Sequence, residues 1–263
     1  MRLYQPHDIS GRNAHGFEDV TISGGGRETV RLQGYRAQRF GITGLFASVA
    51  SGSADDLRFT LTVEEKNSVR TEFRDMPGFV VLPLFANGFL LQAPLLVGRG
   101  QSYLLTVRNP SGSSVDLSLH VAGLTAEQLR QRHDAIRAFL GDVPRIRFAF
   151  ATETVASNGV ERIRLTVPSG DWVMDRPVVG VSADPDEHTW ALANDDGRLL
   201  QDAYVGVFRE YILESTLPTP VAIQRSGDIV AEVENLSAAQ TTAGFLAVLY
   251  ERLEGMPYDD STD

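Results

Sequence analysis

PLLVGRGQSYLLTVRNPS, residues 94–111, aligns without a gap with PVAIQRSGDIVAEVENLS, residues 220–237. The alignment pairs five identical residues: Pro94 with Pro220, Arg99 with Arg225, Val107 with Val233, Asn109 with Asn235 and Ser111 with Ser237. Each copy has an apolar stretch after a proline, a glycine turn, an alternating strand and an asparagine turn. Such an internal match indicates a duplicated unit. Because one strand pair is only marginally stable in water, we expect each copy to close a sandwich with earlier strands of its own domain.

Short β-rich segments surround both copies. In LRFTLTV, residues 57–63, the four apolar residues share one face, as in a half-buried strand. Residues 78–85, 103–108, 115–121, 145–150, 161–167, 178–181 and 245–250 are further predicted strands, separated by Gly, Pro, Asn or Ser. Strands at this spacing are typical of a sandwich or barrel.

The alternation breaks at Thr125. TAEQ, residues 125–128, has the form of a capping box, and apolar residues then recur at helical spacing up to Leu140. Gly141 and Pro144 supply stop signals. We therefore predict a helix over residues 125–140 that separates two domains.

These patterns predict a mainly β chain of two tandem jelly-roll-like β-sandwich domains joined by a short α-helix. The expected parts are an extended N-terminal arm (1–27), a first sandwich (28–124), a linker helix (125–141), a second sandwich (142–254) and an acidic tail (255–263). We expect the glycine-punctuated arm to be disordered in the isolated chain and to become ordered against another subunit, with residues 24–26 as a hinge.

Composition narrows the class of protein. The chain has 263 residues, no cysteine and a net charge of −10, and its 24 basic residues form no basic stripe. We therefore expect a soluble chain that is made in the cytoplasm and has neither nucleic acid nor a membrane as a partner. Disulfides and thiolate zinc sites are excluded.

No group of residues stands out as a catalytic or metal site. The histidines are far apart in the sequence, at His7, His15, His120, His133 and His188. The acidic stretch 184–188 and the following 194–197 do not fit the EF-hand spacing, so we expect solvated turns there and leave calcium as an alternative. The serines around Gly52 and Gly112 lack a nucleophile-elbow context. The sequence thus predicts no catalytic, cofactor-binding or metal-ligating residues and no enzyme.

Aromatic residues leave one alternative open. Trp172 and Trp190, with Tyr204, Phe208 and Tyr211 nearby, are expected to pack in the core. If they were exposed instead, they would form a sugar-binding platform, so a lectin-like module is the alternative.

The segments 93–109 and 219–235 resemble structural proteins of tailed bacteriophage particles, in the order proline, glycine turn, strand, asparagine turn, strand. The resemblance covers about 30 residues in each copy and implies no site residues. It implies a non-enzymatic virion component, such as a minor capsid, decoration or fibre-anchoring protein, that contacts other virion proteins and copies of itself. A tail or neck protein is the alternative within the particle.

Overall fold

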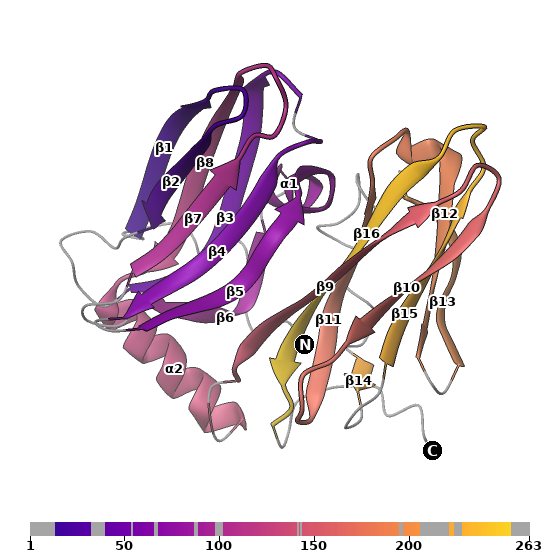
Figure 1. Cartoon of the computed structure of the whole chain (residues 1–263). Helices are drawn as coiled ribbons and strands as arrows, with labels where there is room; N and C mark the ends of the chain where they lie inside the picture. Colours follow the sequence, from indigo (N-terminus) through magenta and orange to yellow (C-terminus); the bar gives the residue numbers. More distant parts are fainter. Residues whose placement is uncertain are drawn as a thin grey trace. The chain divides into compact units, whose positions relative to one another are not determined.

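The computed structural model divides the chain into two compact units (Figure 1). Unit 1 extends to Arg145, and unit 2 runs from Ile146 to Arg252. The structure describes residues 14–32, 40–53, 55–65, 68–86, 89–97, 102–140, 142, 144–194, 197–205, 221–223 and 228–253. The acidic tail predicted at 255–263 lies outside the described residues, as do Pro220, Arg99 and Arg225 of the internal match.

The described residues of unit 1 form eight strands in two antiparallel sheets. One sheet has the order β1 (Ala14–Ile22), β8 (Val115–Leu124), β3 (Phe40–Ser51), β6 (Phe89–Val97). The other has the order β2 (Arg27–Leu32), β7 (Ser102–Arg108), β4 (Arg58–Glu65), β5 (Ser68–Pro77). Strands that are distant in sequence, such as β1 and β8, are direct neighbours.

Unit 2 also contains eight described strands in two antiparallel sheets. The first has the order β14 (Val221–Ile223), β11 (Trp172–Val181), β16 (Thr241–Glu251), β9 (Ile146–Val155). The second has the order β10 (Val160–Thr166), β15 (Asp228–Asn235), β12 (His188–Asn194), β13 (Gly197–Tyr204). A short 3₁₀ helix, η3 (Pro185–Glu187), precedes β12.

The two units have the same topology. When the strands of each unit are counted from one to eight, both units have one sheet in the order 1-8-3-6 and one in the order 2-7-4-5. This is the strand order of a jelly roll, the eight-stranded double sheet built from two Greek keys. The predicted mainly β fold with jelly-roll-like sandwiches is confirmed, and the duplication indicated by the sequence extends over all eight strands.

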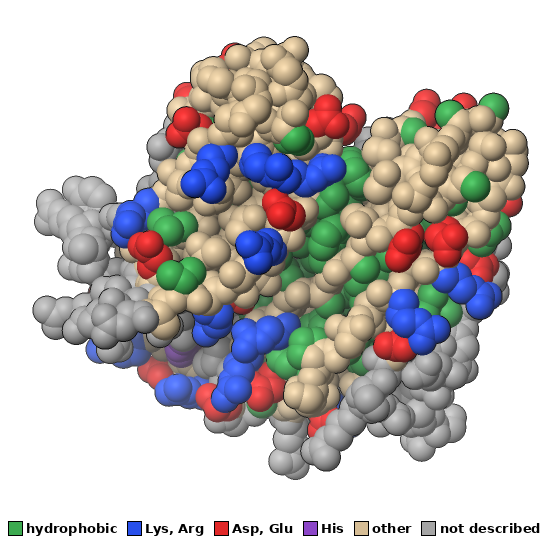
Figure 2. Space-filling model, viewed as in Figure 1, with side chains coloured by type: hydrophobic (Ala, Val, Ile, Leu, Met, Phe, Trp, Pro, Cys, Tyr) green, Lys and Arg blue, Asp and Glu red, His purple; other side chains and the backbone are tan. Residues whose placement is uncertain are grey.

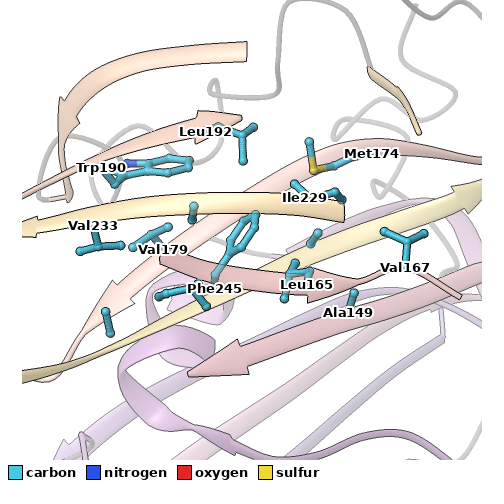
Figure 3. Close-up of a cluster of buried hydrophobic side chains, with 14 of the residues drawn as sticks. Ala149, Leu165, Val167, Met174, Val179, Trp190, Leu192, Ile229, Val233 and Phe245 are labelled. Atoms are coloured by element: carbon cyan, nitrogen blue, oxygen red, sulfur yellow. The ribbon is translucent and has the colours of Figure 1, made fainter. Parts of the chain in front are cut away.

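Apolar side chains fill the space between the two sheets of unit 2. Charged side chains lie on the visible surface (Figure 2), whereas Figure 3 shows Phe245 of β16 pointing toward the sheet that holds Trp190 and Leu192. Full burial of a side chain of this size contributes about 1.5–3 kcal/mol relative to exposure. Residues two apart on a strand point to the same face, so Trp190 and Leu192 share one face of β12.

The segment 78–85 was predicted as a strand, and this prediction is wrong. It forms α1 (Gly78–Ala86), and the Gly78 amide donates to the Leu57 carbonyl oxygen at 2.7 Å. The consecutive residues Phe79, Val80 and Val81 are all buried. This stretch therefore lacks the alternation of buried and exposed residues that a half-buried strand shows. An apolar run without alternation fits a helix that is buried all round as well as it fits a central strand.

The predicted N-terminal arm is wrong for its described part. Residues 14–22 form β1, which pairs with β8 along its whole length, and Ile22 is fully buried. The glycines at 24–26 form a tight turn instead of a hinge. Gly25 has φ = 71°, and a Cβ on Gly24 would lie 2.4 Å from the Gly112 carbonyl oxygen. Residues 1–13 lie outside the described residues.

The predicted helix at 125–140 is confirmed as α2 (Ala126–Leu140), which follows β8 in the chain. The capping box forms: the Thr125 amide donates to Gln128 Oε1 at 3.0 Å, and the Gln128 amide donates to Thr125 Oγ1 at 3.4 Å. These two bonds satisfy amides that a helix start leaves without intrahelical partners. Within the described part of the chain, no helix has the length and apolar character of a membrane span.

Candidate functional site

The described histidines lie on separate elements. His120 is half-buried on β8, His133 lies on α2, and His188 is buried at the start of β12. Burial, assisted by the charge of Arg137, lowers the pKa of His133. The described residues contain no group of three or more His, Asp or Glu side chains arranged to hold a metal ion. His15 lies on β1, and His7 lies outside the described residues.

The acidic stretch considered for calcium forms the turn around η3. Asp184 caps this turn, because its Oδ1 accepts from the Asp186 amide at 3.0 Å. Nδ1 of His188 lies 2.8 Å from the Asp184 carbonyl oxygen, which can only accept a hydrogen bond. The Leu236 amide donates to the Glu187 carbonyl oxygen at 2.9 Å. The turn is thus fixed by its own hydrogen bonds, while the acidic side chains face solvent.

Both tryptophans pack in the core, as predicted. Trp172 is 6% exposed and Trp190 1% exposed, and Trp172 Nε1 donates to the Pro168 carbonyl oxygen at 2.9 Å. A sugar platform needs an exposed aromatic face, which neither ring offers. Phe208 and Tyr211 lie outside the described residues.

A buried asparagine closes the corner after β7 in unit 1. Nδ2 of Asn109 donates to the carbonyl oxygens of Ile22 and Ser113, at 3.1 and 2.7 Å. Oδ1 of Asn109 accepts from the Ser111 amide at 3.1 Å and from the Ser111 hydroxyl at 2.7 Å. One side chain thereby connects the end of β1 with the turn that leads into β8.

Asn235 closes the equivalent corner in unit 2. Its Nδ2 donates to the carbonyl oxygens of Ala156 and Ala239, at 3.1 and 2.7 Å. Its Oδ1 accepts from the Ser237 amide at 2.9 Å and from the Ser237 hydroxyl at 2.8 Å. Asn158, with φ = 47°, takes the place that Gly25 has in the turn of unit 1.

The asparagine corners account for the identity of Asn109 with Asn235 and of Ser111 with Ser237 in the internal match. Both asparagines are fully buried and bonded on both side-chain atoms, so they stabilise the fold and are not available to a ligand. The triplet Asn235-Leu236-Ser237 also has the form of an N-glycosylation acceptor. Its amide nitrogen is already occupied by the corner, which is incompatible with glycosylation of the folded chain.

The outer face of the β1-β8-β3-β6 sheet of unit 1 is polar near Asp116, whereas further along β8 the Cα partners of His120 are Phe17 and Phe46. Asp116 accepts from the Ser51 hydroxyl at 2.6 Å and from the Thr21 hydroxyl at 2.7 Å. These hydrogen bonds, with that of Ser51 the stronger, lower the pKa of Asp116. Two residues further along β8, the Ser118 hydroxyl donates a hydrogen bond to Asp19. Carboxylates and hydroxyls are typical of a sheet face in contact with water.

The equivalent sheet of unit 2, β14-β11-β16-β9, has an apolar outer face. In β16 the residues that face the core alternate with Leu246, Val248 and Tyr250, which point to the other side of the sheet. These three are 1%, 0% and 2% exposed. Val173 and Val178 lie beside them on β11 and are also buried. This outer face is therefore covered within the folded chain.

The other two sheets carry charged outer faces. In unit 2, Arg162 pairs with Glu232 at 2.9 Å, one of two arginine–carboxylate pairs across β10 and β15. In unit 1, β2, β7 and β4 place Arg27, Arg108 and Arg58 in one row, since their Cα atoms are direct partners. Figure 2 shows a row of basic side chains over this part of unit 1. The sequence did not predict this row, because the three arginines are distant from one another in the chain.

No family model and no curated protein matches the chain. Solved structures with a similar arrangement include the STIV MCP, at 12% identity and TM-score 0.45, covering 96% of this chain and 99% of that one. A second is from Sulfolobus Turreted Icosahedral Virus, at 11% identity and TM-score 0.47, covering 95% and 93%. A third is the major capsid protein from bacteriophage PM2, at 9% identity and TM-score 0.41, covering 94% and 98%. The fold assignment rests on the strand order of the chain itself.

Proposed function

We propose that the chain is a non-enzymatic structural component of a virus particle, placed in or on its capsid, and that it works through contacts between protein surfaces. The observation that carries this proposal is the duplicated jelly roll, with the same strand order in both units. Viral capsid proteins are a principal class built on this fold. Two linked jelly rolls offer twice the sheet faces and edges that one offers to neighbouring subunits.

Lectins and cupins also use jelly rolls, so the surface has to discriminate among these classes. A lectin needs exposed aromatic or polar sugar contacts, and a cupin needs clustered metal ligands. In the described parts of the chain the tryptophans are buried and no metal-ligand cluster occurs. Buried polar side chains such as Asn109 and Asn235 are used within the fold. These observations favour assembly over ligand binding.

Within the particle, a minor capsid, decoration or fibre-anchoring position is the finer proposal, and a tail or neck position is its alternative. The positions differ in copy number and in location. A decoration protein occupies many equivalent sites on the shell, whereas a neck or tail protein occurs in few copies at one vertex or along one axis.

The experiment is quantitative mass spectrometry of density-purified particles from cells that make the protein, combined with antibody labelling in electron micrographs. We expect a fixed ratio of this chain to the other particle proteins, and label on the capsid. A host cytosolic protein of similar abundance is the control for contamination. Absence of the chain from purified particles contradicts the proposal. Specific glycan binding by the isolated protein favours the lectin alternative.

A further inference from the structure

The arginine row on unit 1 consists of Arg27, Arg108 and Arg58, on three adjacent strands of the β2-β7-β4-β5 sheet. Arg27 and Arg58 are each the direct Cα partner of Arg108. All three lie on the outer face, because their neighbours Val107 and Phe59 are buried in the core. Adjacent strands are about 4.8 Å apart, so the row extends over about 10 Å.

The chain neutralises this row only in part. Arg108 forms a 3.7 Å ion pair with Asp75, and both side chains remain more than half exposed. Within the described part of the chain, Arg58 donates to the backbone carbonyl oxygens of residues 55–57. Arg27 is exposed, and no partner of its side chain is found among the described residues. Like charges directly opposite one another in a sheet are destabilising, so the row costs folding stability.

The fold does not require arginine at these positions. The asparagine corners align Arg108 with Glu234 in unit 2, since these residues precede Asn109 and Asn235. The Cα partners of Glu234 are Val160 and Thr189, in the places of Arg27 and Arg58. The same jelly roll thus forms with a row of Val, Glu and Thr. A destabilising row that the fold does not need points to a binding role.

The acidic turn of unit 2 has the complementary charge. Asp184, Asp186 and Glu187 are exposed, and the turn that holds them is fixed by the hydrogen bonds around η3 and His188. No ion pair to Asp186 or Glu187 is found among the described residues. Such a preorganised group loses little conformational freedom on binding. The chain as a whole carries a net charge of −10, so the partly neutralised arginine row lies in a chain with an excess of acidic residues.

We propose that the arginine row of one copy binds the acidic turn of a second copy. Guanidinium groups bind carboxylates through paired, charge-assisted hydrogen bonds. The row offers three guanidinium groups, and the turn offers the carboxylates of Asp186 and Glu187 and the second oxygen of Asp184, whose Oδ1 caps the turn. The contact is heterologous, because it joins different surfaces of the two copies, and it therefore propagates into rings or larger assemblies. It depends on charge and weakens with added salt. The inference goes beyond the capsid role and does not depend on it.

The test measures self-association of the full chain by sedimentation velocity at low and high salt. We expect association at low salt that weakens as salt is added. The variant Arg27→Glu/Arg108→Glu should associate at least about tenfold more weakly, and Asp186→Arg/Glu187→Arg should show a similar loss. The control Arg130→Glu reverses one exposed charge on α2 and should leave association nearly unchanged.

Combining the two double reversals in one chain should restore association, because the charges are again complementary. Circular dichroism confirms that each variant is folded before association is compared; single reversals replace any variant that does not fold. The proposal is overturned if the wild type stays monomeric at all salt concentrations, if the row reversals have no greater effect than Arg130→Glu, or if the combined variant is not restored. Loss of binding to single-stranded DNA in the row variants, with association unchanged, would identify a polyanion site and also overturn it.

Discussion

The two jelly rolls share their strand order and asparagine corners but differ on the outer face of the same sheet. In unit 1 that face carries Asp116 with its two hydroxyl donors and the half-buried His120. In unit 2 the equivalent places hold Thr242 and Leu246, and Leu246 is buried. A jelly roll is therefore specified by the space between its sheets and by its corners. The outer faces are free to diverge, and in unit 2 one of them has become a covered apolar surface.

The largest expected effect comes from placing a polar group on the covered face. Leu246→Asn should lower the free energy of unfolding by at least about 3 kcal/mol, because it removes buried apolar area and buries an amide without partners. When Asn235 is aligned with Asn109, Leu246 corresponds to His120. The matched change in unit 1 is therefore His120→Asn. It should cost less than about 1 kcal/mol. Urea unfolding measures the free energy of unfolding of both variants. Equal losses of free energy would contradict the proposed difference between the two faces.

The second effect tests what the units have in common. Asn109→Ala and Asn235→Ala should each lower the free energy of unfolding by about 2–4 kcal/mol, because each leaves carbonyl oxygens and an amide without partners. The two losses should agree within about 1 kcal/mol if the corners are equivalent. Urea titrations of the two variants and the parent chain give the comparison. A large loss in one unit and none in the other would show that only one corner stabilises the fold.

A smaller effect is expected at the residue paired with each corner. His188 is the Cα partner of Asn235, and Leu57 takes the corresponding place before β4 in unit 1. With Nδ1 bonded to Asp184, Nε2 of His188 is buried and has no partner among the described residues. His188→Leu should therefore change stability by no more than about 1 kcal/mol, in either direction.

The reverse exchange in unit 1 is the control. Leu57→His should destabilise the protein by about 2 kcal/mol or more, because it places a ring nitrogen in a site built for an apolar side chain. Thermal and urea unfolding of both variants check the pair. A strong loss from His188→Leu would show that the histidine has a role that leucine cannot take.

The smallest effect concerns pH. The hydrogen bonds from Ser51 and Thr21 hold the pKa of Asp116 below its ordinary value. The carboxylate therefore contributes stability above its unfolded pKa of about 4, and this contribution is lost as the pH falls through the folded pKa. The difference in urea midpoint between the parent and Asp116→Asn should be largest near neutral pH and should shrink on acidification. Thr242→Asn, at the equivalent place in unit 2, should show no such dependence.

The sequence predicted the parts of the fold that follow from local pattern. Alternating apolar residues marked strands such as 57–63, and the capping box marked the start of α2 at Thr125. The repeated asparagine and serine indicated the duplication because both corners use the same two side chains. These features depend on neighbours in the chain, which a single sequence contains.

The parts that failed depend on partners distant in sequence. Residues 14–22 have no regular pattern of their own and form a strand because β8 pairs with them from the far end of unit 1. Residues 78–85 are apolar without alternation, and only their surroundings determine that they form a helix. The apolar outer face of β16 had a local signal, the unbroken run from Phe245 to Tyr250. Such runs occur in strands that are buried on both faces.

The most direct test of the difference between the two faces is thiol accessibility, since the chain contains no cysteine. Leu246→Cys and His120→Cys are made separately, with Ser48→Cys as an exposed reference on the outer face of unit 1. The thiols at positions 120 and 48 should react with a thiol reagent in the folded protein. The thiol at position 246 should react only after urea unfolds the chain. Equally fast reaction at positions 246 and 120 in the folded state would contradict the account.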